Sequence, residues 1–213
     1  MDDIIEVYFN IGGKHNIYNV LGCIACGKVL GIDLQTIVKG IENIKEVDGR
    51  YNTYKSIKGY TIVVDYAHTP DGLDNILKSL RPLTDKKLIS VFGCGGNRDV
   101  TKRAIMGQIS GELADITILT SDNPRFEDPN AIIEQIELGL KKLTDNYIKI
   151  ENRKNAIEYA MKIAKQGDVI LIAGKGQETY QDIKGVKHHF SDKEIVQEIL
   201  SEEKIKENLQ LHN

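Results

Sequence analysis

Residues 88–125 read LISVFGCGGNRDVTKRAIMGQISGELADITILTSDNPR. This run opens with Leu88–Phe92, a mostly apolar segment that is typical of a buried strand. A glycine-rich loop follows, and a helix is predicted from about Thr101 to Ala114. A second apolar strand, Ile116–Thr120, then leads into the polar residues SDNPR. A strand, a helix and a strand in this order predict a βαβ unit with two parallel strands.

The same alternation continues on both sides of this unit. Further strands are predicted at Tyr60–Val64, Tyr147–Ile150 and Val169–Ala173. Further helices are predicted to begin at Thr69-Pro70, Asp128-Pro129, Arg153 and the capping box Ser191-Asp192-Lys193-Glu194. The polar tail after Ser201 is expected to fray. The predicted fold class is α/β, with a Rossmann-like, mainly parallel sheet flanked by helices.

The segment before this alternation has a different pattern. Apolar residues at helical spacing predict a helix over about residues 14–30, and Asp33 is expected to cap a second helix. Asp48-Gly49-Arg50 forms a turn-like junction. We therefore expect two units, residues 1–50 and residues 51–213. On their own, the two helices of the first unit are expected to expose an apolar face.

Composition and charge exclude several classes of protein. The chain has 213 residues, of which 41% are hydrophobic and 28% charged, as in ordinary globular proteins. The net charge of -3 leaves no basic excess for nucleic acid or for an anionic membrane. No run approaches the roughly 20 apolar residues of a membrane helix. The start MDDIIE has no signal-peptide pattern, and three cysteines make no disulfide framework, so a cytoplasmic location is expected.

Ligands of parallel α/β sheets bind at the carboxyl ends of the strands. The four loops expected there are residues 65–72, 93–99, 121–128 and 174–180. In the third of these loops, an arginine at a strand end is suited to hold a carboxylate through two parallel hydrogen bonds. That arginine is Arg125, and Arg98 is a second cation at the same predicted edge.

Each of these loops also has a purely structural interpretation. Asp122 to Pro124 are turn formers, and the glycines of 93–96 suit a flexible loop. Thr69-Pro70 is explained by helix capping alone, although an aspartate at a strand end, here Asp65, often meets a ribose in this fold class. The sequence GKG at 174–176 is common by chance.

Two other features are interpreted as structural. Cys23 and Cys26 form a CxxC pattern inside a predicted helix, without a second cysteine pair nearby. We interpret both as small packing residues rather than as a redox or metal site. His188-His189 is interpreted as a solvated loop pair.

Taken together, six motifs resemble those of the Mur ligase family in identity, order and spacing. The matching segments are Gly13–Asn19, Val47–Arg50, Asp65–Pro70, Gly93–Asp99 with Lys102-Arg103, Asp122–Arg125, and Gly174–Gly176 with Glu178. The resemblance extends from about Gly12 to Asp192, nearly the whole chain. DYAHTP, GCGGNRD and DNPR are most similar to the motifs of members that add meso-diaminopimelate.

The resemblance implies a fold and an activity. Members of the family build UDP-N-acetylmuramoyl peptides in the cytoplasm by ATP-dependent amide formation through an acyl phosphate. Residues 51–213 would form the C-terminal, amino-acid-binding domain, and residues 1–50 the end of the central ATP-binding domain. The implied partners of the full-length enzyme are meso-diaminopimelate, ATP and UDP-N-acetylmuramoyl dipeptide.

The resemblance also implies roles for individual residues. Asn16 and Asn19 would contact the adenine, Arg50 the ATP phosphates, Asp65 the ribose and His68 the nucleotide nearby. The residues that would hold the incoming amino acid are Arg98, Asp122, Asn123, Arg125, Gly174 and Glu178. Within this chain the resemblance implies neither a catalytic residue nor a metal ligand.

The chemistry of the substrate agrees with the second set. Meso-diaminopimelate carries at its distal end a carboxylate that lysine lacks. Arg125 and Arg98 suit this carboxylate, and Glu178 and Asp122 suit the ammonium beside it. A site built around an arginine is expected to reject lysine, because the guanidinium would be left unpaired.

The sequence departs from the family pattern in three respects. Gln177 replaces a histidine common in relatives, and His15 replaces a phenylalanine. No GxxGK[ST] phosphate-binding loop occurs in the 213 residues. ATP and Mg²⁺ are therefore expected to serve the full-length enzyme and not to bind this chain tightly, and the chain alone is expected to be inactive.

Two alternatives stay open. One is another ligase of the same superfamily, of the lysine-adding, cyanophycin or folylpolyglutamate type, against which the DNPR motif argues. The other is a stand-alone module that binds an amino acid or a nucleotide without catalysis.

Overall fold

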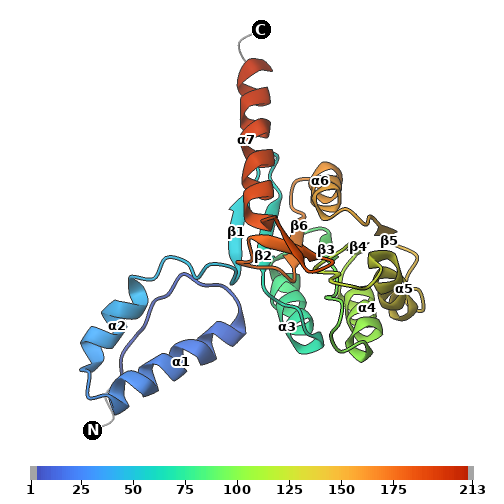
Figure 1. Cartoon of the computed structure of the whole chain (residues 1–213). Coiled ribbons are helices and arrows are strands. Elements are labelled where there is room, and N and C mark those ends of the chain that lie inside the picture. Colours follow the sequence, from blue (N-terminus) through green and yellow to red (C-terminus); the bar gives the residue numbers. More distant parts are fainter. Residues whose placement is uncertain (1–3, 211–213) are drawn as a thin grey trace.

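The computed structural model describes residues 4–210, which are built around a six-stranded sheet with the strand order β1-β2-β6-β3-β4-β5. Its strands are β1 (Asn52–Lys55), β2 (Thr61–Asp65), β3 (Leu88–Phe92), β4 (Ile116–Leu119), β5 (Tyr147–Lys149) and β6 (Val169–Ala173). Strands β2 to β6 are parallel, and β1 pairs antiparallel with β2 at one edge. The predicted fold class is confirmed (Figure 1).

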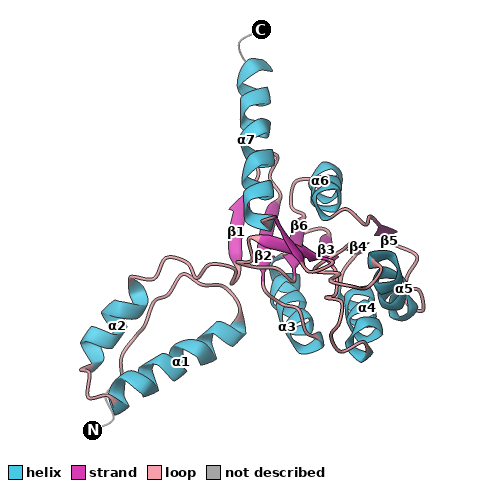
Figure 2. Ribbon diagram, in the orientation of Figure 1, coloured by secondary structure: helices cyan, strands magenta, loops and turns pink. Residues whose placement is uncertain are grey.

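Helices cover both faces of the sheet (Figure 2). One face packs against α3 (Pro70–Leu80), α4 (Thr101–Leu113) and α5 (Pro129–Leu140), and the other against α6 (Arg153–Ile163) and α7 (Asp192–Gln210). A short 3-10 helix, Arg81–Leu83, follows α3. The expected caps are present: Thr69 and Asp128 accept a hydrogen bond from a backbone N–H of the first turn of α3 and α5, and Ser191 accepts one from the Glu194 N–H of α7. Asn152 caps α6 in the same way, which was not predicted.

The strands are buried on both faces, which explains their apolar sequences. Along β6, Val169 and Leu171 face the α3–α5 layer, whereas Ile170 and Ile172 face α6 and α7. This alternation with a period of two residues lets one strand contribute to both halves of the core.

Helices α1 (Lys14–Val29) and α2 (Leu34–Glu42) project away from the sheet (Figure 1). Asp33 caps α2 as predicted, with its side chain accepting from the Thr36 N–H. The expected exposed apolar surface is present on α1, where Ile17, Tyr18 and Leu21 are 47%, 67% and 54% exposed.

Several predictions about local structure were wrong. The strand β1 and the hairpin of β7 (Tyr180–Ile183) and β8 (Val186–His189) were not predicted, because they are four residues each and carry no apolar run. His188-His189 lies in β8 and not in a loop. The last helix does not fray after Ser201 but continues to Gln210.

The prediction for the CxxC pattern was also wrong in part. Cys23 and Cys26 lie in α1 as expected, but both side chains are exposed. They are therefore not packing residues within the part of the chain that the structure describes. Among residues 4–210, no helix is both long enough and apolar enough to span a membrane.

Helices α4 and α5 cross with their backbones in close contact. A Cβ atom added to Gly107 of α4 would collide with the carbonyl oxygen of Ile136 in α5, and one added to Gly139 of α5 would collide with the carbonyl oxygen of Ala104 in α4. Both neighbours are backbone atoms, so neither can rotate away. The two glycines thereby place α4, and the glycine-rich loop before it, against the sheet.

We therefore expect Gly139→Ala to destabilise the fold, because the added methyl group forces the two helices apart. The free energy of unfolding should fall by about 1–3 kcal/mol, as is typical of overpacking. Chemical denaturation followed by circular dichroism measures it. The matched control is Gly40→Ala in α2, where an added Cβ meets no atom within 4 Å. A loss of stability of the same size in both variants would contradict the packing argument.

Candidate functional site

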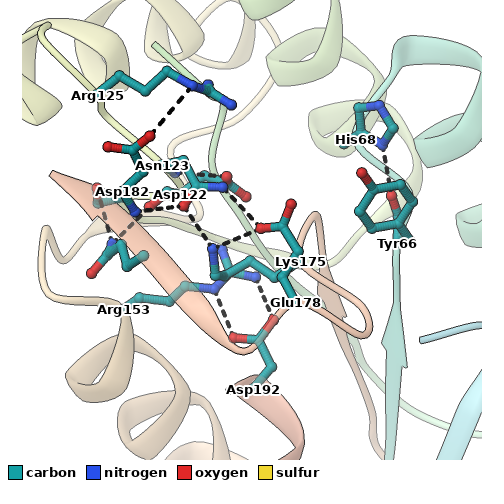
Figure 3. Close-up of polar contacts among 12 residues, drawn as sticks. Tyr66, His68, Asp122, Asn123, Arg125, Arg153, Lys175, Glu178, Asp182 and Asp192 are labelled. Atoms are coloured by element: carbon teal, nitrogen blue, oxygen red, sulfur yellow. Dashed lines mark hydrogen bonds and ion pairs between the residues drawn. The ribbon is translucent and has the colours of Figure 1, made fainter. Parts of the chain in front are cut away.

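The loops that follow β2, β3, β4 and β6 meet at the carboxyl edge of the sheet and enclose a pocket of about 490 Å³. Its lining includes all six residues predicted from the sequence to hold an amino acid: Arg98, Asp122, Asn123, Arg125, Gly174 and Glu178. Four of these side chains are drawn in Figure 3. The sheet thus brings together residues that lie up to 80 positions apart in the sequence (178 − 98 = 80).

Asn123 links two sides of this pocket. Its Nδ2 donates to Glu178 Oε2 at 2.8 Å, and its Oδ1 accepts from Lys175 Nζ at 3.0 Å and from the Asp182 N–H at 2.9 Å. The side-chain amide is only 3% exposed. A buried amide with both ends bonded has one orientation, so Asn123 acts as a fixed strut between the loop after β4 and the loop after β6.

Lys175 is the cation at the centre of this network (Figure 3). The residue is fully buried, and its Nζ donates to Asn123 Oδ1 and to Glu178 Oε2, both at 3.0 Å. The ring centroid of Tyr180 lies 5.7 Å from the same ammonium. Glu178 therefore has one carboxylate oxygen occupied by two protein donors, which orients the side chain and leaves Oε1 for another partner.

Arg125 is held in an uncommon backbone conformation. Its φ is 51°, in the left-handed region that side chains seldom adopt. The backbone is held there by β7, because the Arg125 N–H donates to the carbonyl of Asp182 at 3.0 Å and its carbonyl accepts from the Lys184 N–H at 2.7 Å. Backbone strain of this kind is concentrated at functional sites, where the surroundings enforce it.

The guanidinium of Arg125 is only partly used by the protein. Nη1 donates to the carbonyl of Gly96 at 2.8 Å, and Nε lies 4.0 Å from Asp182 Oδ2. A guanidinium has five N–H donors, so several remain for a ligand.

Arg98 and Arg125 both approach Gly95. A Cβ atom at Gly95 would be 2.9 Å from Arg125 Nη1 and 3.8 Å from Arg98 Cγ. The absence of a side chain at this position lets the two arginines approach one another. The structure thus places both predicted cations in one pocket.

A partly buried ion pair joins the two loops that carry these arginines. Arg103, on the inner face of α4, is fully buried and donates to both carboxylate oxygens of Glu127, at 2.8 and 3.0 Å. It also donates to Gln135 Oε1 at 2.8 Å and to the Gly95 carbonyl at 3.3 Å. The hydrogen bonds from Arg103 and from the Asn97 N–H hold the pKa of Glu127 below its ordinary value.

A second buried pair supports Asp122 and Gly174 from the other side (Figure 3). Arg153 donates from Nε and Nη2 to the two oxygens of Asp192, each at 2.8 Å, and from Nη2 to the carbonyl of Ala173 at 2.9 Å. Burial opposes the charge of Arg153, but Asp192 outweighs it and raises the pKa of the guanidinium. This bidentate pair ties the end of β6 to the start of α7.

The residues predicted to contact a nucleotide are only partly brought together. Arg50, Asp65 and His68 line a second pocket of about 210 Å³, which shares Tyr66, His68 and Thr69 with the first. In this wall the rings of Tyr66 and His68 lie 4.6 Å apart, and the Arg50 guanidinium lies 5.1 Å from the Tyr66 ring centroid.

Asp65 is already engaged with the backbone. Its carboxylate accepts from the Tyr51 N–H at 2.9 Å and from the Ala67 N–H at 2.8 Å. Asn16 and Asn19 lie on α1 and line neither pocket; Asn19 Nδ2 donates to Asn16 Oδ1 at 2.9 Å, and Asn16 Nδ2 to the Gly12 carbonyl at 2.6 Å. These contacts orient the three side chains without a ligand.

Two further observations concern other parts of the surface. A larger cavity of about 610 Å³ lies between α6, α7 and the β1–β2 turn, but its lining is mostly lysine and glutamate, and it includes none of the loops at the carboxyl ends of β2, β3, β4 and β6. Within the described residues, no group of three or more histidine, cysteine, aspartate or glutamate side chains is placed to hold a metal ion.

Sequence reasoning missed the residues that support the site. Arg103, Lys175 and Arg153 are charged, so they were not expected in the core, although the first two lie inside recognised motifs. Of their partners, Asp192 was explained by helix capping alone, and Glu127, just before the predicted start of α5, was given no role. A charged residue on the apolar face of a predicted helix, as Arg103 is, was the available signal.

Comparison with known proteins agrees with this geometry. The family model described as "Mur ligase, glutamate ligase domain" matches residues 49–176. A UDP-N-acetylmuramoyl-L-alanyl-D-glutamate–2,6-diaminopimelate ligase from Clostridium botulinum is 50% identical over 198 residues, which are 92% of this chain and 41% of that protein. The corresponding ligase of Clostridioides difficile is 47% identical over 195 residues, with coverage of 92% and 40%.

Solved structures show the same relationship. A UDP-N-acetylmuramoyl-L-alanyl-D-glutamate–2,6-diaminopimelate ligase structure matches with a TM-score of 0.71 and 37% identity, over 92% of this chain and 40% of that one. The folylpolyglutamate synthase of Mycobacterium tuberculosis, at 22% identity and a TM-score of 0.63 over 79% of this chain and 39% of that one, shares the fold. The chain spans about 41% of the length of the first of the curated relatives it matches. Because the family model covers more than half of the chain, from the Gly49 turn to the loop after β6, the chain belongs to the Mur ligase family and carries its glutamate ligase domain.

Proposed function

We propose that this chain is the C-terminal part of an ATP-dependent ligase that adds meso-diaminopimelate to UDP-N-acetylmuramoyl-L-alanyl-D-glutamate during peptidoglycan synthesis. Residues 51–213 form its amino-acid-binding domain, and residues 1–50 are the end of its ATP-binding domain. The observation that carries this proposal is the pair of guanidinium groups, Arg98 and Arg125, in one pocket with the carboxylates Asp122 and Glu178.

The pocket recognises the distal end of the amino acid. Its carboxylate is bound by Arg125 and Arg98, and the ammonium beside it by Glu178 Oε1 and Asp122. Asn123 and Gly174 complete the site, Asn123 by holding Glu178 and Gly174 by admitting the ligand close to the backbone. The buried cation Lys175 donates to Glu178 Oε2 and thereby orients the carboxylate for an ammonium ligand.

The chemistry of amide formation assigns the chain a positioning role. ATP phosphorylates the carboxylate of the dipeptide, and the free amine of meso-diaminopimelate attacks the acyl phosphate to give the amide, ADP and phosphate. Holding the distal end in the pocket directs the reacting amine towards the nucleotide side. Arg50, Asp65 and His68 line the neighbouring pocket and would meet the nucleotide there. Asn16 and Asn19, on α1 outside this pocket, would contact the adenine.

Discrimination against lysine follows from the unpaired guanidinium. Lysine has no distal carboxylate, so its binding would desolvate Arg125 without giving it a new partner. A site that is built to bond a group rejects the analogue without that group far more strongly than it rejects a change of size. The same reasoning argues against a lysine-adding ligase as the parent enzyme.

We expect the purified 213-residue protein to bind meso-diaminopimelate in preference to L-lysine, and Arg125→Ala to remove this preference. Loss of a charge-assisted, bidentate contact should weaken diaminopimelate binding by about 100-fold and leave lysine binding nearly unchanged. Titration calorimetry with both amino acids measures the two constants.

The matched control is Arg81→Ala, which removes an arginine from a surface ion pair with Asp115 at the opposite edge of the sheet. This variant should keep the preference for the diacid. Wild-type protein that binds both amino acids equally, or an Arg125→Ala variant that still prefers the diacid, would refute the assignment.

We also expect the 213-residue protein alone to form no amide product from ATP, the UDP-dipeptide and meso-diaminopimelate. Phosphoryl transfer requires a phosphate-binding loop and a Mg²⁺ site, and the sequence contains no GxxGK[ST]. Product detection by mass spectrometry, with a full-length diaminopimelate ligase as positive control, tests this expectation. Product above background would show that the residues present are sufficient for phosphoryl transfer.

A further inference from the structure

We propose that the buried Arg103–Glu127 ion pair is a specificity-determining positioning pair, which sets the separation of Arg98 and Arg125 and thereby the selectivity for an amino acid with a distal carboxylate. This inference rests on the proposed function for the identity of the ligand. The claim that the pair holds the two arginine-bearing loops together does not depend on it.

The pair joins the two loops from behind. Glu127 lies two residues after Arg125, and its carboxylate accepts from the backbone N–H of Asn97, the residue before Arg98. Arg103 binds both oxygens of this carboxylate and also donates to the carbonyl of Gly95. One guanidinium and one carboxylate therefore contact both loops at once.

Further hydrogen bonds join the same two loops. Arg125 Nη1 donates to the carbonyl of Gly96 at 2.8 Å, and the Gly96 N–H donates to the carbonyl of Asn123 at 2.9 Å. The Phe126 N–H donates to Asn97 Oδ1 at 3.1 Å. Because the two loops are bonded to one another at several points, the separation of the two guanidinium groups depends on both loops and not on either loop alone.

The pair itself does not reach the ligand. Neither Arg103 nor Glu127 is among the residues that line the pocket. Arg103 is fully buried, and the Glu127 side chain is 29% exposed. The pair must therefore act through Arg98 and Arg125, so both members are positioning residues.

The geometry of the Arg103–Glu127 hydrogen bonds explains why the pair is sensitive to small changes. A planar guanidinium that bonds a carboxylate with two parallel hydrogen bonds fixes both distance and angle, whereas a lysine ammonium would act as a point charge. Misplacing a binding group by about 1 Å is enough to lose as much as 100-fold in activity. When two arginines bind one carboxylate, displacement of either guanidinium relative to the other weakens the binding.

The primary test uses Glu127→Gln in the 213-residue chain, with meso-diaminopimelate and L-lysine titrated separately by calorimetry. Glutamine keeps the size of the side chain and an acceptor for the Asn97 N–H, but it presents an amide donor to Arg103 and breaks the bidentate bond. The selectivity ratio, which is the Kd for L-lysine divided by the Kd for meso-diaminopimelate, should fall by about tenfold. The fall should come mainly from weaker binding of the diacid.

The matched control is Asp115→Asn. Asp115 accepts from Arg81 at 2.6 Å and from the Leu88 N–H at 2.7 Å, so it joins an arginine to a backbone amide as Glu127 does. This pair lies at the amino ends of the strands, away from the pocket. Asp115→Asn should lower stability and leave the selectivity ratio unchanged. If the selectivity ratio fell equally in Asp115→Asn and Glu127→Gln, the Arg103–Glu127 pair would be only a general stabilising contact, and the proposal would be wrong.

A second variant separates positioning from folding. Arg103→Met alone leaves the carboxylate of Glu127 without its partner, and the double variant Arg103→Met/Glu127→Gln removes that charge and should recover part of the lost stability. Selectivity should stay low in the double variant, because the link between the loops is still missing. Selectivity that returns together with stability would overturn the proposal.

Hydrogen exchange tests the mechanical claim without any ligand. Loss of the pair should speed amide exchange in residues 93–99 and 121–127 and leave β3 and β6 protected. Unchanged exchange in both loops would overturn the claim that the pair holds them. If wild-type protein shows no preference for the diacid while exchange responds as expected, the proposed function fails and the holding role stands.

Discussion

Buried charge at the carboxyl edge of the sheet must be paired, and this constraint organises the site. Lys175, Arg103 and Arg153 are all almost or completely inaccessible to solvent. Lys175 is compensated by Glu178 of its own loop, whereas Arg103 and Arg153 are compensated by Glu127 and Asp192 from other segments. An isolated charge in such a place costs several kcal/mol, so the latter two pairings each draw two segments together. Charge neutralisation thereby helps to fix the loops around the pocket.

This arrangement separates the residues that hold the site from those that face the pocket. The carboxylates of the supporting pairs are bonded at both oxygens to an arginine of the protein, whereas Arg125 and Glu178 each retain donor or acceptor capacity towards the pocket. A preorganised binding site needs rigid support together with side chains that keep free hydrogen-bonding groups facing the pocket. Little ordering then remains to be done when the ligand binds. The left-handed backbone at Arg125 is another part of this preorganisation, because β7 enforces a conformation that the chain would otherwise avoid.

Much of the site was readable from sequence because a parallel sheet makes its geometry nearly inevitable. Once Leu88–Phe92, Ile116–Leu119 and Val169–Ala173 are identified as strands, the loops after them must meet at one edge. The family motifs then identify the side chains there. The nucleotide residues follow this rule less well, since Asn16 and Asn19 lie on α1, a helix that projects from the sheet and whose position the strand order does not determine (Figure 1).

The sequence by itself determined the α/β class and most helices and strands of the sheet layer, because apolar periodicity and capping residues are local signals. The family motifs identified six of the residues that line the pocket: Arg98, Asp122, Asn123, Arg125, Gly174 and Glu178. Only the tertiary structure decided which charges are buried and with whom they pair. Arg103 and Glu127 are 24 positions apart, and Arg153 and Asp192 are 39 apart. No local pattern encodes such a partner. The short strands β1, β7 and β8 became visible only in the structure, because backbone pairing to a neighbouring strand, and not apolar character, makes them strands.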